Sequence, residues 1–129
     1  MKKIETSQAA AAIGPYSQGI VANGFVFTSG QIPVDPATGE VKGNTAEEQA
    51  EVVMRNLDAV LRAGGAALDT VIKTTCFLND IANFAAFNSV YAKYFGTVAP
   101  ARSCMAVRDL PKGVMVEVEA VALVVKEEQ

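Results

Sequence analysis

Two stretches of the chain repeat apolar residues with the period of an amphipathic helix. In the first stretch, the apolar positions are Ala46, Ala50, Val53, Met54, Leu57, Val60 and Leu61. Thr45 precedes this run, and Glu48 lies three residues after Thr45, which is a capping-box pattern. Gly64 and Gly65 follow the run and are typical of the end of a helix. The pattern predicts one helix of about five turns between these signals.

The second, shorter stretch has an aromatic face. Its apolar positions are Phe84, Phe87, Tyr91, Tyr94 and Phe95. Asp80 is the expected N-cap of this helix, and Gly96 is its expected terminator. The sequence therefore predicts two amphipathic helices, each with one face that must pack against another element.

The other apolar segments are rich in β-branched or aromatic residues and are bounded by Gly, Pro, Asn or Asp, as is typical of strands. They comprise residues 20–21, 25–29, 71–78, 102–107 and 114–125. Residues 35–39 and 110–113 have the composition of turns. Because strands precede and separate the helices, we expect a mixed or antiparallel sheet with both helices on one face. The prediction is a two-layer α+β fold in a single domain that spans residues 1–129.

The last predicted strand is largely apolar on both faces. One face carries Val114, Val116, Val118, Ala120, Ala122 and Val124, and the other carries Met115, Glu117, Glu119, Val121, Leu123 and Val125. Two helices can cover only one face of the sheet. We therefore expect a partner subunit on the second face.

Arg102, Glu117 and Glu119 lie inside segments that otherwise have the composition of buried strands. A buried charge needs a partner or a ligand, because an uncompensated ion in an apolar site is strongly destabilising. We expect strands 102–107 and 114–125 to form an antiparallel hairpin with Cys104 opposite Glu117. Arg102 and Cys104 would then share a face with both glutamates. A slip of one residue would turn the glutamates toward the helices, where their burial costs more.

Each of these residues has a structural and a chemical interpretation. Arg102 could bind a carboxylate through its forked donors, or form a salt bridge with Glu119 across a subunit boundary, and the residues alone favour the salt bridge. Glu117 could act as a general base or position a water, but a solvated or paired charge is the simpler interpretation. Cys104 could be a nucleophile, although a small interior residue is favoured.

Composition narrows the chemistry further. The chain of 129 residues has no histidine, which removes His-based acid–base catalysis, Ser-His and Cys-His pairs and the commonest zinc ligand. Its net charge of -3 disfavours a nucleic-acid partner. Its two cysteines are expected to be reduced thiols, and no phosphate-binding, dinucleotide-binding or metal motif occurs, so we expect no cofactor and no metal. Without a secretory or membrane-spanning segment, we expect a cytoplasmic protein.

Five blocks of sequence closely resemble the RidA/YjgF family of reactive-intermediate (enamine/imine) deaminases. They are residues 12–19 (AIGPYSQG), 27–33 (FTSGQIP), 100–104 (PARSC), 110–112 (LPK) and 116–120 (VEVEA). The blocks fall in family order over nearly the whole chain. The resemblance implies a chorismate-mutase-like α+β fold with about six strands, assembled as a homotrimer with clefts between neighbouring subunits.

The resemblance also implies a reaction. It is the cofactor-free hydrolysis of 2-aminoacrylate and related 2-iminoacids, such as 2-iminobutanoate and 2-iminopropanoate, to 2-ketoacids and ammonia. In the family, the arginine matching Arg102 holds the substrate carboxylate and the glutamate matching Glu117 positions or activates the attacking water. The positions that line the cleft match Tyr16, Ser29, Gly30, Asn88 and the backbone of Cys104.

The sequence departs from the family pattern at two places, and two alternative functions stay open. The connection 96–99 is shorter than in many relatives and lacks an aromatic residue, and Arg108-Asp109 replaces a pair that usually begins with a small residue. We expect the short connection to influence substrate side-chain preference. One alternative is a non-catalytic regulatory or chaperone-like protein that binds small carboxylates. The other is a ribonuclease or translation inhibitor, which the acidic charge and the missing histidine disfavour.

Overall fold

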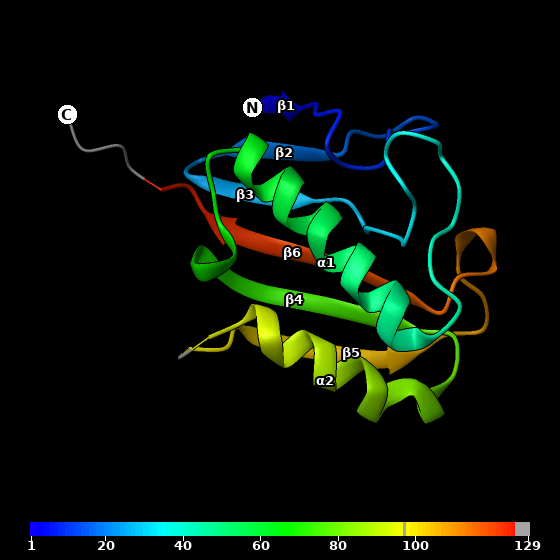
Figure 1. Cartoon of the computed structure of the whole chain (residues 1–129). Helices are drawn as coiled ribbons and strands as arrows, with labels where there is room; N and C mark the ends of the chain where they lie inside the picture. Colours follow the sequence, from blue (N-terminus) through cyan, green and yellow to red (C-terminus); the bar gives the residue numbers. More distant parts are fainter. Residues whose placement is uncertain (97, 126–129) are drawn as a thin grey trace.

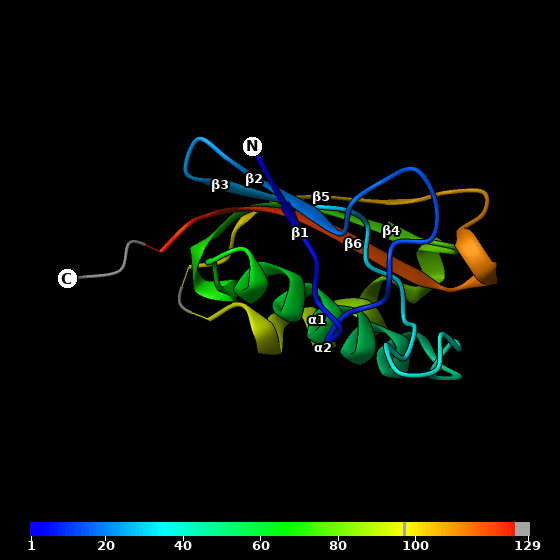
Figure 2. The ribbon, with the colours of Figure 1, turned by 90° about the horizontal axis from the view of Figure 1, so that it is seen from above.

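Two helices lie on one face of a six-stranded sheet, which gives the two-layer α+β arrangement that the sequence predicts (Figures 1 and 2). The computed structural model describes residues 1–96 and 98–125. The strands are β1 (Lys2–Ile4), β2 (Gly19–Ala22), β3 (Phe25–Thr28), β4 (Val71–Leu78), β5 (Ala101–Ala106) and β6 (Val116–Leu123). Their order across the sheet is β1-β2-β3-β6-β4-β5.

The predicted hairpin between the last two strands is wrong. β5 pairs in parallel with β4, and β6 lies between β3 and β4 and is antiparallel to both. The cause is the second helix, which connects β4 to β5 and carries the chain back across the sheet, so that the two strands run in the same direction. Cys104 is therefore the partner of Cys76, and Glu117 is the partner of Phe77.

Helix α1 (Ala46–Ala63) forms as predicted and supplies most of the helical side of the core. The backbone N–H of Glu48 donates to the Thr45 hydroxyl at 3.1 Å. The Glu48 carboxylate accepts from the N–H of Asn44 at 3.0 Å, one residue before the position expected for a capping box. The buried apolar residues of α1 match the predicted face: Ala46, Ala50, Val53, Met54, Leu57, Val60 and Leu61.

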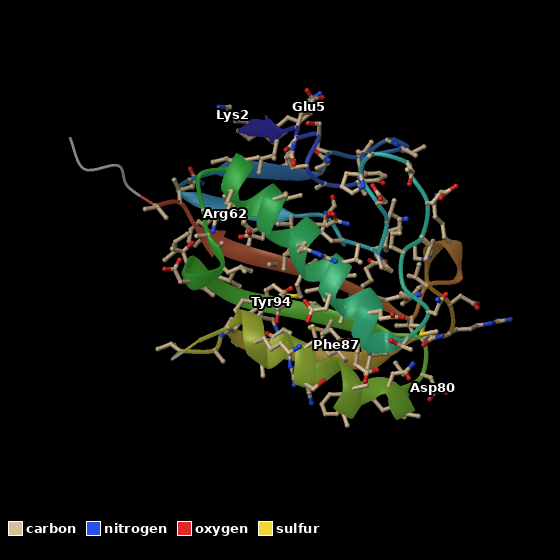
Figure 3. All side chains as sticks on the ribbon, in the orientation of Figure 1. Lys2, Glu5, Arg62, Asp80, Phe87 and Tyr94 are labelled. Atoms are coloured by element: carbon tan, nitrogen blue, oxygen red, sulfur yellow. The ribbon has the colours of Figure 1, made fainter. Side chains whose placement is uncertain are left out.

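Helix α2 (Phe84–Tyr94) is shorter than predicted at its start. Asp80 caps a separate 3-10 turn, Ile81–Asn83, by accepting from the N–H of Ala82 at 2.9 Å, and it lies at the N-terminal end of the helical segment (Figure 3). The helix ends just before Phe95, close to the predicted stop. Thr97, within the short connection 96–99, lies outside the described residues.

The open face of the sheet, opposite the helices, carries exposed apolar side chains. In β6, Val116, Val118 and Ala120 are buried under the helices, so the alternate residues point to the open face. The apolar residues of this face include Phe27, Met105 and Leu123, each with at least 40% of its surface exposed. The sheet therefore has the uncovered apolar face that the alternation in the last strand predicts.

Candidate functional site

The Arg102 side chain lies on the helix side of β5, at the edge of the sheet, and points to α2. Its Nη1 donates to Oδ1 of Asn88 at 2.7 Å. Its Cζ lies 4.7 Å from the ring centroid of Tyr91 and 5.5 Å from that of Phe84, which is cation–π geometry. Among the described residues, Asn88 supplies the one side-chain hydrogen bond to this guanidinium. The remaining donors can bind an anion, and a carboxylate matches their planar geometry.

Cys104 lies two residues after Arg102 and on the same side of β5. It is half-buried, and burial raises the pKa of its thiol, while the charge of Arg102 has a smaller, opposite effect. Its strand neighbour Cys76 is fully buried, and burial raises the pKa of that thiol to about 12. Both cysteines are free thiols. A raised pKa disfavours the thiolate, so this geometry favours the interpretation of Cys104 as a packing residue.

Glu117 lies on the other side of the sheet, at the wall of a cavity of about 690 Å³. Tyr16, Ser29 and Gly30 line the same cavity, together with apolar residues of the segment that follows β3. The structure thus brings together four of the residues that the sequence singles out. This cluster is called the Glu117 group below, and Arg102 with Asn88 is called the Arg102 group.

The backbone places Glu117 against Gly30. The N–H of Gln31 donates to the carbonyl of Val118 at 2.8 Å, and the N–H of Val118 donates to the carbonyl of Gln31 at 3.1 Å. This isolated bridge fixes Gln31, the residue after Gly30, beside Val118, the residue after Glu117. A Cβ atom at Gly30 would overlap the Glu117 carboxylate, so the close approach requires glycine at this position.

Ser29 and Tyr16 are held by their own loop. The Ser29 hydroxyl donates to the carbonyl of Ser17 at 2.5 Å, and the Ser29 N–H donates to the carbonyl of Gln18 at 2.9 Å. The Tyr16 hydroxyl accepts from the N–H of Ile13 at 3.3 Å, while 54% of the Tyr16 surface stays exposed. The ring is therefore available to a ligand or to another protein chain.

Gln18 is a buried residue that sequence reasoning did not single out. Its side-chain Oε1 accepts from the N–H of Thr6 at 2.7 Å, and its Nε2 donates to the carbonyls of Thr6 and Ala10 at 3.0 and 2.8 Å. These bonds fasten residues 6–10 to the loop that carries Tyr16. The sequence offers little signal for this role beyond an amide inside a loop bounded by glycines, because the partners are backbone groups.

The pKa of Glu117 is raised above its ordinary value. Burial is the main cause, because the ionised form loses hydration at the cavity wall, and the charge of Glu119 adds to the effect. Glu119 follows at the next position on the same face of β6. A carboxyl group with a raised pKa is suited to exchanging a proton with a water or a ligand near neutral pH.

The Glu117 group and the Arg102 group lie on opposite faces of the sheet. Arg102 pairs in register with Thr74, which is fully buried beneath the helices, whereas Glu117 pairs with Phe77 on the open face. The expectation that Arg102 shares a face with Glu117 and Glu119 is therefore wrong. It fails because it rests on the hairpin between β5 and β6, which the chain does not form.

Neither helix within 1–96 and 98–125 is both long and apolar enough to span a membrane. Within the same residues, no three side chains among Cys, Asp and Glu form a group that could hold a metal ion.

The sequence is similar to a well-populated protein family. The sequence model of the family described as Endoribonuclease L-PSP matches residues 6–124. A Lactococcus lactis protein with the name "Putative regulator AldR" is 49% identical over 122 residues, which are 95% of this chain and 97% of that protein. Reactive Intermediate Deaminase A, a chloroplastic protein of Arabidopsis thaliana, is 44% identical over 119 residues, which are 92% of this chain and 64% of that protein.

Solved structures of similar sequence also have the same fold. A protein of unknown function from Yersinia pestis, YyfA of the Rid protein family, superposes with a TM-score of 0.92 at 48% identity, over 95% of this chain and 98% of that one. TdcF from E. coli, crystallised with bound serine, superposes with a TM-score of 0.90 at 43% identity, over 95% and 98% of the two chains.

Proposed function

The chain belongs to the RidA/YjgF family, and we propose that it hydrolyses reactive 2-iminoacids to 2-ketoacids and ammonia, with 2-iminobutanoate and 2-iminopropanoate as substrates. We further propose that it acts as a homotrimer and that each active site lies in a cleft between two subunits. Arg102 would come from one subunit and the Glu117 group from its neighbour.

The observation that carries this proposal is the separation of the two groups within one chain. A 2-iminoacid has its carboxylate and its reacting carbon on adjacent atoms, so the groups that bind them must lie close together. The side chains of Arg102 and Glu117 project from opposite faces of the sheet. A second copy of the chain can place its Glu117 beside the Arg102 group, and a repeated face-to-edge contact of this kind closes into a ring when the rotation between copies allows it.

The open face supplies a surface for such an assembly. Phe25 and Leu123 are register partners on it, as are Phe27 and Val121, and the ring centroids of Phe25 and Phe27 lie 6.2 Å apart. Exposed apolar area of this kind is typical of a surface that another subunit covers. The Arg102 group lies at the edge of the same sheet, on β5, where a neighbouring subunit could approach it.

The reaction suits the residues of the two groups. The guanidinium of Arg102 binds the substrate carboxylate through paired hydrogen bonds, which orients the C=N carbon. Glu117 accepts a proton from a water as its oxygen adds to that carbon. In the resulting tetrahedral adduct the nitrogen takes up two protons, one returned by Glu117 and one lost from the adduct's hydroxyl group, so it leaves as ammonia and the oxygen becomes the carbonyl of the 2-ketoacid. An imine is already electrophilic, so orientation and these proton transfers carry most of this chemistry.

The serine bound to TdcF supports a site for small amino-acid-like carboxylates in this fold. Serine carries a carboxylate beside an amino-substituted carbon, the same arrangement as in a 2-iminoacid. We propose that the Arg102 group of this chain binds the carboxylate of such ligands.

A coupled assay tests the proposal. A dehydratase generates the imine in the presence of wild type, Arg102→Ala or Glu117→Ala, and ketoacid release is followed over time. We expect wild type to accelerate release, Arg102→Ala to raise KM, and Glu117→Ala to lower kcat. Equal rates in all three samples would contradict an enzymatic role.

A second candidate function is a regulator that binds small carboxylates without converting them. The name "Putative regulator AldR" of a relative at 49% identity favours it, as does the Arg102 group, which can bind a ligand whether or not a reaction follows. Calorimetry with 2-ketobutyrate separates the two functions. Binding by wild type that depends on Arg102, without any acceleration of imine hydrolysis, would favour the regulator.

A further inference from the structure

We propose that Tyr91 is a positioning residue for Arg102: its ring, fixed by a buried hydrogen bond to Thr74, holds the guanidinium in the plane that binds a carboxylate. The inference rests on the proposed function, in which Arg102 binds the carboxylate of the substrate. Tyr91 does not itself need to touch the ligand.

Helix α2 presents one stripe of side chains to Arg102. Phe84, Asn88 and Tyr91 are spaced by four and three residues, so they lie along one face of the helix. Asn88 fixes one nitrogen of the guanidinium, at 2.7 Å, and the ring of Tyr91 lies 4.7 Å from its central carbon. This hydrogen bond and the two ring contacts, with Tyr91 and with Phe84 at 5.5 Å, together restrict both the position and the tilt of the group.

The Tyr91 ring is itself held by a polar contact inside the core. Its hydroxyl and the hydroxyl of Thr74 are 2.8 Å apart, and Thr74 is fully buried while Tyr91 is 7% exposed. Phenylalanine and valine would fill the same volumes without placing two hydroxyls in an apolar layer, where each needs a partner. The pair is thus better explained by orientation than by packing.

Thr74 and Arg102 are register partners on the neighbouring strands β4 and β5. Strand β5, which carries Arg102, is therefore held in register with Thr74, the residue that anchors the Tyr91 ring. Phe87 and Phe95 pack against Tyr91 with centroid distances of 5.5 and 4.7 Å, which limits the ring's movement further. An arginine held in this way loses less side-chain entropy when it binds a carboxylate, so the affinity for the carboxylate rises.

The test compares binding and turnover in four full-length proteins: wild type, Tyr91→Leu, Tyr91→Phe and Val90→Ala. Val90→Ala is the control, because it also removes buried side-chain volume from α2 but lies outside the stripe of Phe84, Asn88 and Tyr91 that faces Arg102. We expect Tyr91→Leu to weaken 2-ketobutyrate binding about ten-fold and to raise KM equally, with kcat little changed. Tyr91→Phe keeps the ring and loses its anchor, so we expect a loss of about three-fold. Val90→Ala should bind as wild type does.

A double-mutant cycle with Arg102→Gln distinguishes positioning from a general loss of structure. If Tyr91 acts through Arg102, Tyr91→Leu weakens binding in wild type but has no further effect in the Arg102→Gln background. An equal loss in both backgrounds, or an equal loss in Val90→Ala, would overturn the inference. If Tyr91→Leu does not fold, the same cycle with Tyr91→Phe decides the matter. Failure of wild type to bind 2-ketobutyrate through Arg102 would instead contradict the proposed function.

Discussion

Arg102 and Glu117 lie on opposite faces of one sheet, although a single strand, β4, separates the strands that carry them. Arg102 points under α2 and is held there by Asn88, whereas Glu117 lies at a cavity on the other side, against Gly30. A molecule as small as a 2-iminoacid cannot contact both side chains of one chain. The proposed reaction therefore depends on how copies of the chain assemble.

The contact between Arg102 and Asn88 predicts how ligand affinity responds to charge. Asn88→Ala removes one hydrogen bond to a charged group, and we expect 2-ketobutyrate binding to weaken about ten-fold. Asn88→Asp places a carboxylate on the guanidinium, where it competes with the ligand, so the loss should be larger. Titration calorimetry measures both. Asn83→Asp, which adds the same charge at the start of α2, is the control, and a loss in that variant equal to the loss in Asn88→Asp would contradict this prediction.

Gly30 should be indispensable for turnover and dispensable for folding. In Gly30→Ala the new methyl group displaces the Glu117 carboxylate, and we expect kcat to fall by at least ten-fold, in line with the typical contribution of a general base. Gly96→Ala is the matched control, because a Cβ at Gly96 meets no atom within 4 Å. Steady-state assays and circular dichroism check the two effects. Normal turnover in Gly30→Ala would show that the position of Glu117 does not matter.

The raised pKa of Glu117 predicts the pH dependence of stability. Between its ordinary value of 4.5 and its raised value, the folded state binds more protons at this group than the unfolded state does. The contribution of Glu117 to stability therefore falls as pH rises through this window. We expect Glu117→Gln to melt at a higher temperature than wild type at pH 7, with a smaller difference at pH 4. Glu40→Gln, at an exposed site, serves as the control. A larger stabilisation at pH 4 than at pH 7 would have the wrong sign.

Cys104 should not act as a nucleophile. Burial raises the pKa of its thiol, so little thiolate forms near neutral pH. We expect Cys104→Ala to keep kcat within about two-fold of wild type, because only the backbone of this residue is proposed to face the ligand. Ketoacid release measures this directly. A variant that still binds 2-ketobutyrate but no longer releases ketoacid would revive the covalent mechanism.

The periodic parts of the fold can be predicted from the sequence because local patterns determine them. The face of α1 and the alternation along β6 follow from the spacing of apolar residues, and the structure confirms both. Strand pairing is not local, and the hairpin expected between β5 and β6 is wrong for that reason. The better signal was the helix between β4 and β5, since such a connection favours parallel strands. Strand β1 was missed because it has three residues and one buried side chain, Ile4.

The functional site shows the same difference between local patterns, which the sequence reveals, and long-range contacts, which it does not. Charge inside apparent strands indicates Arg102 and Glu117, and the family resemblance adds Tyr16, Ser29, Gly30 and Asn88. Three supporting contacts have no such signal: the hydrogen bonds of the Gln18 side chain, the backbone bridge of Gln31 to Val118, and the hydrogen bond between Tyr91 and Thr74. These contacts are with backbone groups or with side chains distant in sequence, such as Thr74, so no spacing in the chain announces them.

Subunit complementation tests the central claim most directly. Arg102→Ala and Glu117→Ala chains are co-expressed, native mass spectrometry verifies that mixed trimers form, and ketoacid release is assayed at a low imine concentration, where we expect each parent alone to have little activity. If every site takes Arg102 from one subunit and Glu117 from the next, each mixed trimer contains one intact site. An equal, random mixture should then recover about one quarter of wild-type activity. Mixed trimers that stay as inactive as their parents would contradict the claim that the site is shared between subunits.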